Sequence, residues 1–320
     1  MQISNKVWFI VKLVMLFAIL WYVWIRLKDE QANLDSILTQ MQQLLHGERL
    51  AGLSVVVLLI VVNWSLEAKK WQLLAHRIEP ISFVQAIKSV LAGLSLGFLA
   101  PAFLGDATAK VLSLQSEQRT KSLGAVVLGG GIQFYVALCF GTIAYFYFLI
   151  DVKEVVHLSE WILSILLLFS ILLGFWLFIK RTNLPQLFEK KWLSTYGHFF
   201  QVLGEYSQKE LIAITQVAVM RYLTFSLQFL LILQIFAISL PILDLTAVVF
   251  LVFLAKTVIP AFNFLSDLGV REFSALYFFQ YFHVPSAQVV SATLSLWMLN
   301  ILLPVLVGSV LVLQLKVSKV

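Results

Sequence analysis

Charged residues and cysteine are both scarce in this chain of 320 residues. Only 12% of the residues are charged, about half of the roughly 25% typical of soluble domains, whereas 60% are hydrophobic. A soluble fold could not bury so much apolar surface, so the composition excludes a soluble enzyme and predicts an integral membrane protein. The single cysteine, Cys139, excludes an internal disulfide framework and a thiolate metal site, and is expected to serve helix packing.

Catalytic and metal-binding patterns are also missing. The five histidines are scattered and show no metal-ligand spacing, and no glycine-rich phosphate loop, nucleophile elbow or paired-carboxylate pattern occurs. We therefore expect no metal and no cofactor. The net charge of +6 is spread along the chain, which suits cytoplasmic loops beside anionic lipid better than a nucleic-acid surface.

The main feature of the sequence is a series of long apolar runs. A membrane-spanning helix needs about 20 apolar residues, and six runs come near or exceed this length: 7–25, 50–66, 123–150, 161–179, 211–240 and 287–314. Two further runs, 86–100 and 245–259, are shorter. Between residues 34 and 45, apolar residues recur with helical spacing in an otherwise polar stretch and predict an amphipathic surface helix, so residues 1–49 are interpreted as an N-terminal helix plus this surface helix.

The two shorter runs each lead into a charged break, and the two breaks are variants of one another. Residues 101–110 read PAFLGDATAK, and residues 260–271 read PAFNFLSDLGVR. Each break places a basic residue four positions after an aspartate, and the aspartates and the basic residues are each 161 positions apart. The pattern predicts two re-entrant helical hairpins, with tips marked by Pro101, Gly105, Pro260 and Gly269.

The distribution of Lys and Arg predicts the topology. With the N-terminus in the cytoplasm, the segments 67–88, 105–122, 180–210 and the C-terminal tail are cytoplasmic and hold four, three, five and two of these residues, and the external segments 26–50, 151–158 and 241–244 hold three, one and none. Three crossings separate the hairpins, so they should enter from opposite faces. We thus predict a single all-α transmembrane domain, 1–320, with six spans, two hairpins, inverted repeat halves at 50–180 and 211–320, and both termini cytoplasmic.

The charges at the breaks are candidate functional residues. Asp106 and Lys110 are one helical turn apart, as are Asp267 and Arg271, and could pair on one helix face. Charges at membrane depth are costly, which favours a function, although each pair could instead only neutralise itself. In the functional interpretation the cations bind a lipid phosphate while the carboxylates tune or release it; the remaining candidates for this cavity are Arg221, Lys256 and Glu272. Arg221 could bind the phosphate or pair with Asp106 or Asp267.

These residues resemble a known family. The sequence KWQLL at 70–74 and the break ending at Lys110 are similar to elements of the flippase-like family built around the transmembrane domain of lysylphosphatidylglycerol synthase, the multiple peptide resistance factor. The stretch DLGVRE at 267–272 is similar to a second element. Lys110 replaces the family's usual Arg, and Asp267 replaces its usual Gly.

The resemblance implies a flippase of the bacterial cytoplasmic membrane that moves an anionic, aminoacylated or polyisoprenoid-linked lipid between leaflets. The family's synthases carry a soluble catalytic domain after the membrane part, and no such domain occurs up to Val320, so an enzyme is not expected. The expected partner is the lipid; a homodimer or a lipid-synthase partner is compatible with this function. Two alternatives stay open: an intramembrane enzyme with Asp106 or Asp267 as acid or base, and a membrane subunit without transport activity.

Overall fold

The chain is all-helical wherever its structure is described. The structure, a computed structural model, describes residues 39, 42, 49–99, 102–115, 121–181, 204–259 and 264–312. The helices in these ranges are α3 (Arg49–Ala75), α4 (Phe83–Leu99), α5 (Ala102–Leu112), α6 (Ser122–Tyr147), η3 (Phe148–Val152), α7 (Leu158–Lys180), α10 (Gln208–Ile235), α11 (Ile242–Val258), α12 (Phe264–Phe279), η4 (Gln280–Phe282), α13 (Ser286–Trp297), η5 (Met298–Leu302) and α14 (Leu303–Val312). The predicted span 7–25 and nearly all of the predicted surface helix lie outside the described residues.

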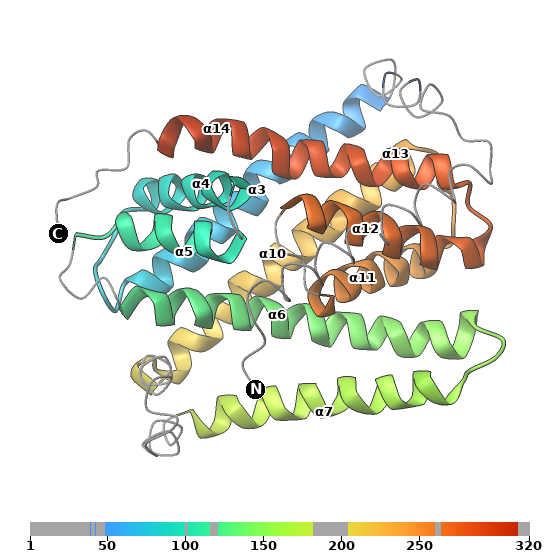
Figure 1. Ribbon diagram of the computed structural model, residues 1–320, viewed down its shortest axis with the longest axis horizontal. Coiled ribbons are helices and arrows are strands. Elements are labelled where there is room, and N and C mark those ends of the chain that lie inside the picture. The colour runs from blue at the N-terminus through green and yellow to red at the C-terminus, as the bar shows by residue number, and fades with distance from the viewer. Residues whose placement is uncertain are drawn as a thin grey trace, which may run out of the picture.

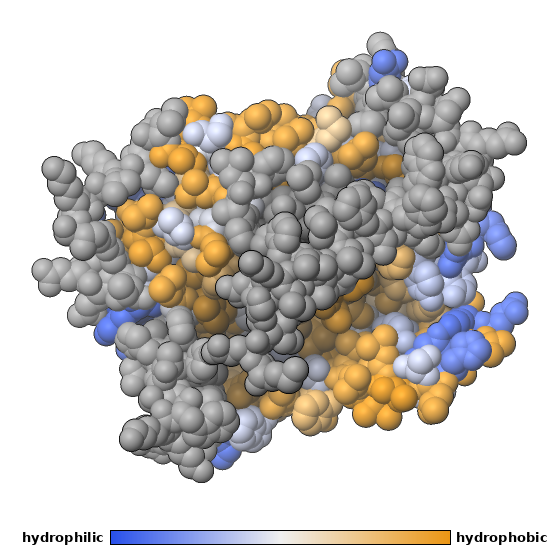
Figure 2. Space-filling model, in the orientation of Figure 1, coloured by the Kyte–Doolittle hydropathy of each residue, from blue (hydrophilic) through white to orange (hydrophobic). Residues whose placement is uncertain are grey.

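Five helical segments within the described residues are long and apolar enough to cross a membrane: Arg49–Ala75, Ser122–Val152, Leu158–Lys180, Gln208–Ile235 and Ser286–Val312. They correspond to five of the six spans that the apolar runs predict. Large apolar side chains are exposed along these segments, above all on α7, where Leu172 is 67% exposed. Hydrophobic residues cover the sides of the long helices, and hydrophilic residues gather near the α6–α7 connection (Figures 1 and 2). The protein is therefore a polytopic helical membrane protein.

Helix α3 is longer than its apolar run. The run ends at Leu66, and the sequence predicted that Glu67 and the following basic residues form a cytoplasmic loop, but α3 continues to Ala75. Glu67 and Lys70 pair within the helix at 2.7 Å, and Trp71 is fully buried. The loop prediction is wrong here because charges three positions apart on a helix satisfy one another, so they need not end the helix.

Helices α4 and α5 pack against each other in antiparallel fashion. A side chain added at Gly93 would meet Asp106, and one added at Gly105 would meet the backbone of Gly97. The outer ends of the pair are joined: the backbone N–H of Gln115, beyond α5, donates to Glu79, ahead of α4, at 2.7 Å. The start of α6 lies at this same end of the molecule (Figure 1). There Lys121, just before α6, forms an ion pair with Glu205, just before α10.

Helices α11 and α12 form a second such pair at the opposite end of α6. The Tyr147 hydroxyl, at the end of α6, donates to Asp244 in the first turn of α11 at 2.7 Å. Phe148 contacts the aromatic ring of Phe278 in α12 with centroids 5.4 Å apart. Both outer ends of this pair thus lie beside the end of α6, whereas α4 and α5 lie toward its start (Figure 1).

The two halves of the chain follow the same order of elements. Helix α3 begins at residue 49 and α10 at 208, and α4 begins at 83 and α11 at 242, an offset of 159 in both cases. Their packing is reciprocal as well: α3 packs on α10, and α4 packs on α14 as α11 packs on α6. With α6 corresponding to the α13–α14 segment, each helix pair therefore packs on the corresponding long helix of the other half, α11 on α6 and α4 on α14.

Substitution of Gly105 by alanine is expected to lower the apparent melting temperature by roughly 5 °C or more, because overpacking of this kind typically costs 1–3 kcal/mol. The added Cβ would lie 2.1 Å from the backbone nitrogen of Gly97, and backbone cannot give way as a side-chain tip can. The measurement is thermal unfolding of the purified protein in detergent. Gly131→Ala is the matched control, because its Cβ would meet nothing within 4 Å; equal melting temperatures for the two variants would contradict the packing described.

Candidate functional site

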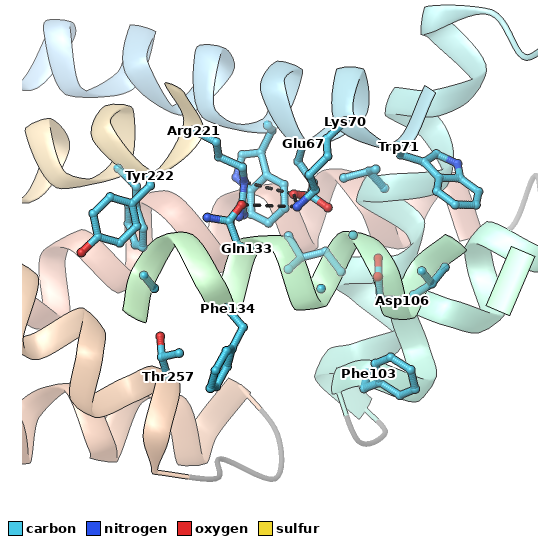
Figure 3. A pocket seen from close by; sticks show the side chains of 18 of the residues that line it. Glu67, Lys70, Trp71, Phe103, Asp106, Gln133, Phe134, Arg221, Tyr222 and Thr257 are labelled. Carbon is cyan, nitrogen blue, oxygen red and sulfur yellow. Dashed lines mark hydrogen bonds and ion pairs between the residues drawn. The ribbon is translucent and has the colours of Figure 1, made fainter. Parts of the chain in front are cut away.

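A cavity of about 380 Å³ lies in the middle of the helices. Both helix pairs contribute to its wall: α5 through Phe103, Asp106 and Lys110, and α11 through Lys256 and Thr257. The remaining wall comes from α3, α4, α6, α10 and η5. Figure 3 shows the charged side chains between α3 and α6, with Phe103, Phe134 and Thr257 on the other side of α6 in that view.

Glu67 is the centre of a buried ion cluster. Its carboxylate lies 2.7 Å from the Lys70 Nζ, 3.2 Å from the Arg221 Nε and 3.4 Å from the Lys110 Nζ. Lys110 also pairs with Asp106 at 2.8 Å, so the pairing predicted from their spacing is confirmed. The cluster joins α3, α5 and α10, three helices that are far apart in the sequence.

Aromatic rings and an amide complete the surroundings of the cations. The Lys110 Nζ lies 5.4 Å from the centre of the Trp71 ring, and the Arg221 guanidinium 5.6 Å from that of Trp64. The Lys256 Nζ lies 5.9 Å from the Phe225 ring, and Lys70 donates to the Gln133 side chain at 3.3 Å. Cation–π contacts of this kind stabilise a cation away from bulk water, so the cations are held at the cavity wall.

The cavity carries more positive than negative charge. In the part of the chain that the structure describes, its lining includes the cations Lys70, Lys110, Arg221 and Lys256 and the two carboxylates Glu67 and Asp106. Among the described residues, Arg221 makes the ion pair with Glu67 and the ring contact with Trp64 but no hydrogen bond. A guanidinium has five N–H donors arranged to bind phosphate or carboxylate in bidentate fashion. The arrangement therefore suits an anion.

The structure brings together four of the residues that the sequence singled out, namely Asp106, Lys110, Arg221 and Lys256. The pairing partner of Arg221 is Glu67; the proposed pairing with Asp106 is not what the structure shows. Arg271 and Glu272 are buried in α12, 0% and 6% exposed, and are not part of the lining of this cavity.

The predicted hairpin tips also need correction. Gly105 lies inside α5, where it packs on α4, and Gly269 is buried inside α12. Neither marks a turn, because the residues after each proline return to helix within a few positions. Pro101, Pro260 and the side chain of Asp267 lie outside the described residues, so the predicted Asp267–Arg271 pair stays a prediction.

Glu67, Lys70, Trp71 and Gln133 line the cavity without having been selected from the sequence. The first three were assigned to the cytoplasmic segment 67–88, yet their spacing carries a usable signal. Glu67 and Lys70 lie at i and i+3, and Trp71 at i+4, which is the pattern of one helix face. No comparable signal marks Gln133.

Fold and site together define a polytopic helical membrane protein with an ion cluster in a central, cation-rich cavity. A family model described as the lysylphosphatidylglycerol synthase TM region matches residues 8–308. The chain belongs to this family, as the sequence motifs predicted. No curated protein and no solved structure matched the chain. Membership is consistent with a membrane protein of lipid metabolism or transport.

Proposed function

We propose that this protein is a flippase that moves a lipid between the leaflets of a bacterial cytoplasmic membrane, with the headgroup passing through the central cavity. The observation that carries the proposal is the excess of cations in a cavity lined by both hairpins. Intramembrane charges are costly and tend to mark substrate paths. Arg221, whose buried Nε faces Glu67 at 3.2 Å without a hydrogen bond, carries the guanidinium best suited to the lipid phosphate.

The lengths of the hairpin helices support their entry from opposite membrane faces. Helix α6, with 26 residues, is about 39 Å long and can cross the bilayer. Each hairpin helix has 17 residues or fewer, at most about 26 Å, which falls short of the roughly 30 Å hydrocarbon core. Two re-entrant hairpins in inverted halves are a recurring plan of transporters, whose substrate sites lie near the bilayer midplane.

Cysteine labelling tests this topology. In a Cys139→Ala background, we expect His76→Cys and Gln115→Cys to react with an impermeant maleimide only from the cytoplasmic side. Ser239→Cys, His283→Cys and Glu154→Cys should react only from the outside, because these positions flank the other end of the long helices. Labelling of positions 76 and 115 from opposite sides would mean that α4 and α5 do not form a re-entrant hairpin.

Reconstitution tests the activity. Vesicles containing the purified protein and a trace of fluorescent phosphatidylglycerol, labelled on an acyl chain, should lose inner-leaflet fluorescence to dithionite at a rate above that of protein-free vesicles. With no nucleotide pattern in the sequence, translocation would be passive or driven by an ion gradient, and imposing a pH gradient distinguishes the two. Equal rates with and without protein under both conditions would contradict the proposal. Chemical turnover of the lipid, seen by mass spectrometry, would instead favour the intramembrane enzyme.

A further inference from the structure

The ion cluster points to a preference for one class of lipid headgroup. We infer that Glu67 is an internal counter-ion that competes with a lipid phosphate for Lys110 and Arg221, so that the cavity selects lipids whose headgroups carry a net negative charge. The inference rests on the proposed function in taking the cavity as the headgroup site. It gives Glu67, a residue outside the predicted motifs, the role of setting specificity.

The distances indicate which contacts of Glu67 are exchanged. Its closest cation, Lys70 at 2.7 Å, is on the same helix one turn away and stays with it. Its contacts to Arg221 and Lys110, at 3.2 and 3.4 Å, are longer and cross between helices. Lys110 is held more closely by Asp106, at 2.8 Å. A phosphate oxygen can therefore take over Arg221 and share Lys110 while Glu67 keeps Lys70.

The charge balance then decides which headgroups fit. Among the described residues, four cations and two carboxylates line the cavity, so one phosphodiester reduces this excess of positive charge without reversing it. A zwitterionic headgroup brings its own cation, and a lysyl headgroup brings two, into a site whose described lining already carries more cations than carboxylates. Repulsion between like charges is stronger at low dielectric than in water. The cavity thus favours an anionic phospholipid over a zwitterionic or aminoacylated one.

An apolar opening beside the cluster favours a lipid over free phosphate. Phe103 and Phe134 line the same cavity and are 53% and 47% exposed. Gly130 lines the cavity as well, and it has open space where a side chain would lie. Figure 3 shows both phenylalanine rings turned away from Glu67. Acyl chains can leave the cavity past these rings into the bilayer while the phosphate stays at the cations.

Native mass spectrometry of the detergent-purified protein, titrated separately with four probes, tests the inference. Phosphatidylglycerol, with net charge −1, should bind at least about tenfold more tightly than zwitterionic phosphatidylcholine or cationic lysyl-phosphatidylglycerol. A tenfold ratio corresponds to about 1.4 kcal/mol. Inorganic phosphate should bind more weakly than phosphatidylglycerol. Equal binding of phosphate would identify a free-anion site, and equal binding of the three lipids would remove the charge preference; either outcome overturns the inference.

Glu67→Gln separates competition from a merely structural role. Without its competing charge, we expect phosphatidylglycerol to bind about tenfold more tightly while its translocation slows, because release becomes harder. Asp106→Asn, with a side chain 35% exposed, is a second variant that should shift binding in the same direction if Glu67→Gln folds poorly. Glu154→Gln removes an exposed carboxylate away from the cavity and should change neither quantity. Weaker binding of phosphatidylglycerol to both cavity variants would overturn the inference.

The two proposals can fail independently. Selective binding of phosphatidylglycerol without any translocation would contradict the flippase and leave the charge preference intact. Translocation of all three lipids at one rate, with equal binding, would support the flippase and contradict the role of Glu67.

Discussion

Replacement of Arg221 by glutamine should reduce translocation of phosphatidylglycerol at least about tenfold, which is a loss of roughly 1.4 kcal/mol or more of stabilisation. Arg221 lies at the cavity wall, where its Nε is 3.2 Å from Glu67 but makes no hydrogen bond. Hydrogen bonds between a guanidinium and a phosphate are charge-assisted and of the stronger kind. Glutamine keeps part of the length but loses the charge and the planar fork.

The variant is expected to fold, because Glu67 keeps Lys70 and Lys110 as partners. Arg221→Lys should recover only part of the rate, since an ammonium cannot bind in bidentate fashion. The measurement is the dithionite assay, compared at equal protein content per vesicle. Arg77→Gln is the matched control: Arg77 forms an exposed ion pair with Glu210 at the end of the helices, at 2.6 Å, and such pairs contribute about 0–1 kcal/mol. If the two arginine variants translocated lipid at the same rate, Arg221 would not be the phosphate ligand.

Replacement of Glu67 by leucine should lower stability by about 3–5 kcal/mol, the typical cost of removing one partner from a buried ion pair. Leucine would leave Lys70 and Arg221 without their carboxylate, and Lys70 is only 4% exposed. In a chain of this size a loss of this magnitude corresponds to a fall in melting temperature of roughly 10 °C. Thermal unfolding in detergent provides the measurement.

A double variant sharpens this second prediction. Glu67→Leu combined with Lys70→Leu should be more stable than Glu67→Leu alone, because one of the unpaired buried cations is removed with its partner. Glu154→Leu is the surface control, and we expect it to change stability by about 0.5 kcal/mol or less. A Glu67→Leu variant as stable as the wild type would show that the cluster does not hold α3, α5 and α10 together.

The two halves share an order of helices but do not share this chemistry. At the offset of 159 residues between α3 and α10, Glu67 corresponds to Ser226 and Lys70 to Phe229. Ser226 uses its hydroxyl within its own helix, where it donates to the Tyr222 carbonyl at 2.9 Å. The second half therefore lacks the carboxylate around which the ion cluster forms. The repeated breaks do not reveal this difference, because both of them contain an aspartate, Asp106 and Asp267. The difference lies in the helices before the breaks, where α3 carries Glu67 and α10 carries Ser226.

Much of the architecture followed from the sequence alone. Hydropathy identified the membrane class and five spans that the structure describes, because bilayer thickness sets the length of an apolar run. The motifs identified the family. The pairing of Asp106 with Lys110 was also predictable, since a spacing of four positions on a helix brings two side chains together whatever the rest of the chain does.

The site itself was decided by tertiary structure. Arg221 and Glu67 are 154 positions apart in the sequence, and nothing local to either residue indicates their contact. The sequence predicted Lys70 in a basic cytoplasmic loop, whereas in the structure it lines the cavity. Its burial there is compensated by Glu67 on α3 and by Gln133 on α6. Local sequence determined where the helices and their charged breaks lie, whereas the packing of α3 against α5 and α10 determined which charges share one cavity.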